Sequence, residues 1–104
     1  MRAETLKGHL DFLLLATVAA EPAHGYRIIE ELKRRSGGAF ELPEGTVYPA
    51  LHRLEQGGLL ESSWASHTGR RRRIYRLTAR GRRALAGERR QWAGFTRAVE
   101  AVVA

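Results

Sequence analysis

The 104-residue chain contains no cysteine, no asparagine and a single aspartate, Asp11. Without cysteine there are no disulfides, no thiolate nucleophile and no cysteine-ligated zinc. The four histidines are scattered and lack metal-ligand spacing such as HxxxH, and neither a GxSxG nucleophile nor a glycine-rich phosphate loop is present. The sequence therefore predicts a protein that is not an enzyme, with no metal and no cofactor.

Long hydrophobic segments are also missing. The longest apolar stretch, Phe12 to Ala20, is too short to cross a bilayer, and no signal-peptide pattern precedes it. We expect one small cytoplasmic protein with no membrane association. Because so short a chain has a limited core, part of its apolar surface can require a partner subunit.

Acidic residues are few beside the basic ones. The chain has 18 Lys+Arg against 11 Asp+Glu, a formal charge of +7, which favours a polyanionic partner. Coding bias can explain arginine in place of lysine, but it does not explain the clustering. Residues 70 to 90 contain a single acid, Glu88, and the arginines at positions 70, 71, 72, 73, 76, 80, 82, 83, 89 and 90.

Apolar periodicity predicts three helices in the first half of the chain. The first covers residues 8–20 and ends at Pro22, and the second runs from His24-Gly25 to Gly37-Gly38. The third begins near residues 44–46, because Pro49 has no N–H and is tolerated only near the first turn, and Gly57-Gly58 ends it.

The third predicted helix has the composition of a DNA-reading helix. One face is apolar, and the other carries Thr46, Tyr48, His52, Arg53 and Gln56. Hydroxyls at its N-terminus can donate to phosphates, whereas the longer side chains can reach base edges in the major groove. Without asparagine, bidentate recognition of adenine falls to Gln56. The alternative is that the polar residues only solvate an exposed face.

A basic hairpin is expected next. Residues 59–65 and 73–77 have strand character, with residues 66–72 as the loop between them. Arginines concentrated at a hairpin tip repel one another, so we expect Arg70, Arg71, Arg72 and Arg73 to contact DNA phosphates and a minor groove, although a solvated loop is the alternative. The predicted fold is mainly α with a small β-hairpin (α+β), a winged helix-turn-helix.

The last segment predicts a long helix capped by Thr78. A heptad seam of Leu85, Trp92, Phe95, Val99 and Val102 predicts dimerisation, shared between a second copy and the first helix. Trp92 and Phe95 are interface core, or they line a cavity for a small aromatic effector. Two units are expected, the DNA-binding domain over residues 1–78 and the dimerisation helix over residues 79–104.

Four segments of the sequence together resemble the PadR family of transcriptional regulators. They are LKGHLDFLLLATV, HGYRIIEELKRR, GTVYPALHRLEQGGLLES and RRIYRLTARGRRAL. The resemblance implies a winged helix-turn-helix dimer, usually a repressor, with the third helix in the major groove and the wing beside it. The single helix after the wing is similar to that of the short subfamily.

The resemblance also assigns roles to residues. It implies that Tyr26 lies near the DNA backbone, that Thr46, Tyr48 and His52 lie on the reading helix, and that Arg72 and Arg73 belong to the wing. The sequence departs from the family pattern at Arg71, where many members have proline, and at Ile74, where tyrosine is frequent. Family members respond to different ligands, so the resemblance names no effector.

These patterns leave three alternative hypotheses for the function. The first is a homodimeric transcriptional repressor that binds a near-palindromic operator in double-stranded DNA and can be released by a small aromatic effector. The second is a nucleic-acid-binding module without sequence preference, driven by the arginines alone. The third is a protein-interaction domain that acts through the C-terminal helix.

Overall fold

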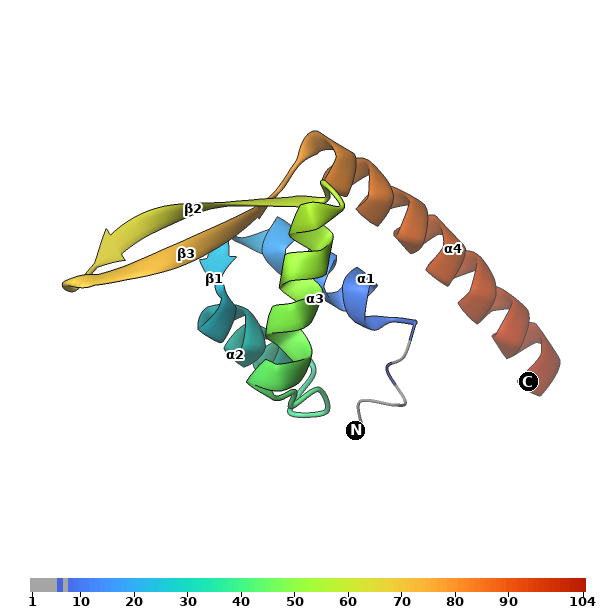
Figure 1. Cartoon of the computed structure of the whole chain (residues 1–104). Helices are drawn as coiled ribbons and strands as arrows, with labels where there is room; N and C mark the ends of the chain where they lie inside the picture. Colours follow the sequence, from blue (N-terminus) through green and yellow to red (C-terminus); the bar gives the residue numbers. More distant parts are fainter. Residues whose placement is uncertain (1–5, 7) are drawn as a thin grey trace.

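The computed structural model describes residue 6 and residues 8–104. It consists of four helices and a small antiparallel sheet (Figure 1). In chain order the elements are α1 (Leu10–Ala20), β1 (Ala23–His24), α2 (Gly25–Arg35), α3 (Glu44–Gln56), β2 (Leu60–His67), β3 (Arg70–Leu77) and α4 (Ala79–Val103).

The helix boundaries follow local chemistry. Gly8 has a φ of +89°, which glycine adopts readily, and α1 begins two residues later. His24 caps α2, because its Nδ1 accepts the backbone N–H of Arg27 at 3.2 Å. The third helix begins at Glu44, within the expected range, and Pro49 lies in its second turn.

The sheet has three strands rather than the two of the expected hairpin. Its order is β1-β3-β2, and both pairings are antiparallel. Strand β1 pairs Ala23 with Tyr75 and His24 with Ile74. Two residues are too few to show an alternating pattern, so periodicity along the chain does not reveal this strand.

The hairpin is also longer than predicted, and the expectation of a loop over residues 66–72 is wrong. Register runs without interruption from Leu60 opposite Leu77 to His67 opposite Arg70. The turn consists of Thr68 and Gly69, with φ values of +50° and +77°, the left-handed geometry that a two-residue hairpin turn requires. The four arginines 70–73 therefore belong to strand β3 and not to a loop.

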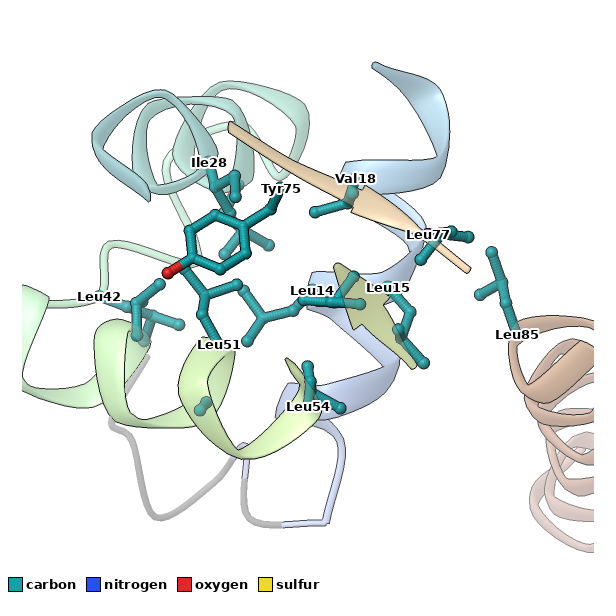
Figure 2. Close-up of a cluster of buried hydrophobic side chains, with 14 of the residues drawn as sticks. Leu14, Leu15, Val18, Ile28, Leu42, Leu51, Leu54, Tyr75, Leu77 and Leu85 are labelled. Carbon is teal, nitrogen blue, oxygen red and sulfur yellow. The ribbon is translucent and has the colours of Figure 1, made fainter. Parts of the chain in front are cut away.

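One hydrophobic core joins the helices to the sheet. Leu14 and Leu15 of α1, Ile28 of α2 and Leu51 of α3 are at most 2% exposed. Tyr75 of β3 lies among them (Figure 2). Complete burial of one such side chain stabilises the fold by about 1.5 to 3 kcal/mol.

The start of α4 is joined tightly to this body. The Thr78 hydroxyl donates to the Gly58 carbonyl at 2.6 Å and accepts the Gly81 N–H at 2.9 Å, which confirms Thr78 as the N-cap. Leu85 is 2% exposed and lies beside Leu77 (Figure 2). Beyond this first part, α4 leaves the body on the side away from the wing formed by β2 and β3 (Figure 1).

Candidate nucleic-acid interface

The outer face of α3 carries the predicted reading residues. Its inner face is fixed by the burial of Val47 and Leu51, which leaves His52 exposed to solvent. Thr46, in the first turn, and Tyr48 are half-buried. The helix thus presents an uneven polar surface of the width that fits a major groove.

Tyr48 is positioned by Gly25, which the sequence patterns marked only as the start of the second helix. A Cβ on Gly25 would lie 2.5 Å from Cε1 and 2.9 Å from the hydroxyl of Tyr48, so the tyrosine ring rests on the backbone at the start of α2. This contact explains the Gly in the HGY motif. The neighbouring Tyr26 is 52% exposed in the first turn of α2.

Arg53, also predicted to read bases, is engaged within the protein. Its Nη2 lies 2.5 Å from Oδ1 of Asp11, the only aspartate, on α1. Both side chains remain about half-exposed. The ion pair directs Arg53 toward α1, and contact with a base would require this pair to open.

The four wing arginines occupy different surroundings because strand residues alternate between faces. Arg70 and Arg71 are exposed. Arg72 has Nη1 at 3.3 Å from Nε2 of His24, the cap of α2. The four arginines therefore do not lie together in a hairpin loop, and their contact with DNA stays a prediction.

Arg73 connects the wing to the reading helix. Its Nε donates to the Ser62 hydroxyl at 2.6 Å, and its Nη2 lies 3.7 Å from Oε2 of Glu55 on α3. The Ser62 hydroxyl in turn donates to Glu55 at 2.6 Å. Glu55 and Ser62 carry no sequence signal, because a single acid and a single serine match no motif.

Burial also acts on the tyrosine beneath this network. Burial, and secondarily the Glu55 carboxylate, raise the pKa of Tyr75 above its ordinary value. The phenol is therefore neutral at physiological pH, and it serves the core rather than the interface.

Other kinds of site find no support within the described residues. No group of three or more His, Cys, Asp or Glu side chains in residues 6 and 8–104 could hold a metal ion. Within the same part of the chain, no helix is long and apolar enough to cross a membrane.

Comparison with known proteins agrees with this geometry. The family model described as "Transcriptional regulator PadR-like family" matches residues 14–87, which include the later part of α1, the whole of α2 and α3, the wing and the start of α4. The chain belongs to the PadR-like family. Its winged helix is therefore that of a DNA-binding transcriptional regulator.

Individual PadR relatives support the assignment over most of the chain. The transcriptional regulator Rv3488 of Mycobacterium tuberculosis is 43% identical over 77 residues, 74% of this chain and 69% of the relative. A PadR family transcription regulator from Clostridium difficile R20291 has a TM-score of 0.82 at 28% identity and covers 93% of this chain and 100% of its own. A regulator from Clostridium thermocellum shows the same fold, with a TM-score of 0.88 at 23% identity over 100% of this chain and 99% of its own.

The heptad seam of this PadR protein is divided by the fold. Leu85 belongs to the core of its own chain, so it is not part of a surface open to a partner. Farther along α4 the apolar side chains emerge into solvent. Their exposed fractions are 47% for Trp92, 53% for Phe95, 42% for Val99 and 85% for Val102.

Trp92 stands at the centre of an aromatic group between α4 and the start of α1. Its ring lies 5.6 Å from that of His9 edge-on, 6.4 Å from Phe12 and 6.0 Å from Phe95 in a stacked arrangement. Heptad spacing alone places Trp92 and Phe95 together, whereas the contribution of His9 and Phe12 depends on how α1 meets α4.

Proposed function

We propose that this PadR regulator is a cytoplasmic homodimeric repressor of a near-palindromic operator. The observation that carries the proposal is the pairing of a polar reading helix, α3, with a basic wing tied to it through Glu55, Ser62 and Arg73. A helix and wing held in fixed relation contact a major groove and the adjacent backbone together.

The dimer is supported by the exposed end of α4. Phe95, Ala98, Val99, Val102 and Val103 line one continuous apolar surface. A monomer gains nothing from exposing several large apolar side chains on one helix face, whereas a second copy would bury them by symmetry. In such a dimer, two α3 helices about 34 Å apart would contact successive major grooves on one side of the duplex.

Release by a small aromatic effector is the third part of the proposal. The stacked pair of Trp92 and Phe95 keeps about half of its surface open, which suits a planar molecule. Binding of planar aromatic compounds should quench Trp92 fluorescence in a Trp64→Phe background. Absence of quenching by any compound that releases the protein from DNA would contradict this site.

The operator is tested by footprinting and electrophoretic shifts on the DNA upstream of the gene, over a series of salt concentrations. We expect a protected near-palindrome, bound more tightly than random duplex, with a log–log salt slope of about 0.9 for each phosphate neutralised. Equal affinity for random duplex would refute the specific regulator.

The Tyr48→Ala and His52→Ala variants distinguish this function from the two alternatives. A specific regulator loses its operator preference in these variants, whereas a module without sequence preference keeps its affinity. Light scattering tests the dimer, because a monomer with an exposed α4 face would favour a protein-interaction domain.

A further inference from the structure

Trp64 is a large apolar side chain in an unusual place. It lies on β2 of the wing, away from the helical core, and is 56% exposed. Ser62, two residues earlier on the same strand, contacts Glu55 of α3. Because strand residues two apart share a face, Trp64 lies on the face of the wing that is turned toward the reading helix.

Two of the wing arginines lie over this indole. The guanidinium carbon of Arg71 is 4.9 Å from the ring centroid and that of Arg73 is 5.2 Å from it, both within the range of a cation–π contact. The strand register explains the arrangement, since Trp64 is opposite Arg73 and Ser66 is opposite Arg71. The ring thus keeps two like charges near each other on one surface.

The two arginines differ in what else holds them. Arg73 is held by Ser62 and Glu55, so its position is fixed relative to α3. Arg71 is exposed, and its guanidinium lies over the indole ring, which orients it. A long side chain loses conformational freedom when it binds a phosphate, and prior stacking reduces that loss.

We propose that Trp64 is a positioning residue for DNA binding, an aromatic plate that holds Arg71 ready to contact a phosphate beside the groove read by α3. This inference rests on the proposed DNA-binding function. Trp64 acts through Arg71, and the face of its ring, rather than its bulk, carries the effect.

The test measures binding of the full chain to a fluorescein-labelled mixed-sequence duplex of about 30 base pairs, three helical turns. Such a duplex suffices because phosphate contacts do not depend on sequence. The variants are Trp64→Ala, Trp64→Phe, Arg71→Gln and the double variant with Trp64→Ala and Arg71→Gln. Arg70→Gln is the matched control, since Arg70 lies on the opposite face of the strand.

We expect Trp64→Ala to weaken binding by about twofold to fivefold, the order of the one exposed cation–π contact that orients Arg71. Trp64→Phe should restore part of the affinity. Arg71→Gln should lower the salt slope by about 0.9 for each phosphate that it leaves without a positive partner, and Trp64→Ala should lower it in the same direction. The double variant should bind about as well as Arg71→Gln alone, whereas the effects of Arg70→Gln and Trp64→Ala should multiply.

Several results would overturn the inference: unchanged affinity of Trp64→Ala, no recovery with phenylalanine, or full multiplication of the Trp64 and Arg71 effects. Thermal unfolding of each variant checks that the fold is intact, because replacement of a side chain this exposed should leave the midpoint nearly unchanged. If the wild-type chain binds no duplex at all, the proposed DNA-binding function fails instead.

Discussion

Replacement of Gly81 by alanine should destabilise this protein strongly, although alanine normally favours a helix. Gly81 lies in the first turn of α4, where a Cβ would be 2.0 Å from the carbonyl oxygen of Leu59 and 3.0 Å from its carbonyl carbon. An ordinary van der Waals contact of a carbon atom is roughly 3.4 Å or longer. The backbone of α4 at residue 81 and the backbone at Leu59 must therefore separate by more than about 1 Å.

The Leu59 carbonyl cannot move without cost, because it accepts the Thr78 N–H at 3.2 Å while the Thr78 hydroxyl bonds Gly58 at 2.6 Å. Overpacking costs about 1 to 3 kcal/mol, and each weakened hydrogen bond about 1 kcal/mol. The higher helix propensity of alanine offsets about 0.5 to 1 kcal/mol of this loss of stability. The free energy of unfolding should therefore fall by about 2 to 4 kcal/mol.

Thermal unfolding followed by circular dichroism measures this change. For a chain of this size, 1 kcal/mol corresponds to roughly 4 to 8 °C, so the midpoint should fall by at least about 8 °C. Gly94→Ala is the matched control in the same helix, since a Cβ there meets nothing within 4 Å. It should leave the midpoint unchanged or slightly raised. Equal midpoints for Gly81→Ala and the wild type, at the same protein concentration, would refute the packing argument.

Two further predictions concern the interface and the core. Gly25→Ala should displace the Tyr48 ring, because the new Cβ would lie 2.5 Å from it. The variant should bind the operator more weakly, while its free energy of unfolding changes by less than about 1 kcal/mol. A large loss of stability with unchanged operator binding would contradict this prediction. Because burial raises the pKa of Tyr75, the folded state holds the phenolic proton more tightly than the unfolded chain does. The free energy of unfolding therefore includes a contribution from this proton that is complete below pH about 10. That contribution disappears as the pH rises through the raised pKa. Urea unfolding at a series of pH values on both sides of this point should show the decline in the wild type and a smaller one in Tyr75→Phe.

Much of the fold was accessible from local patterns. The apolar periodicity of α1, α2 and α3, the stop signals at the glycine pairs and the N-cap Thr78 each depend on residues close in sequence. Strand β1 and the extent of the hairpin were not accessible. Both depend on pairing with β3. Strand β1 pairs with residues about 50 positions away, and two residues are too few to show a periodic pattern.

The candidate site divides in the same way. The residue types at Thr46, Tyr48 and His52, and the arginine cluster, already indicated a DNA-binding protein. Their individual roles did not follow, because Arg53 is drawn to Asp11 across 42 positions of sequence and Arg72 to His24 across 48.

The sequence by itself determined the class of protein. Helix periodicity, turn residues and charge are local properties, so they can be recognised without knowing which residues are in contact. Only the tertiary structure decided which arginines contact other side chains of the protein and which are exposed to solvent. Alternation along β3 sends Arg72 to one face of the wing and Arg71 and Arg73 to the other, where Trp64 and the network from Glu55 meet them. That division follows from strand register and packing, which are set by the whole chain.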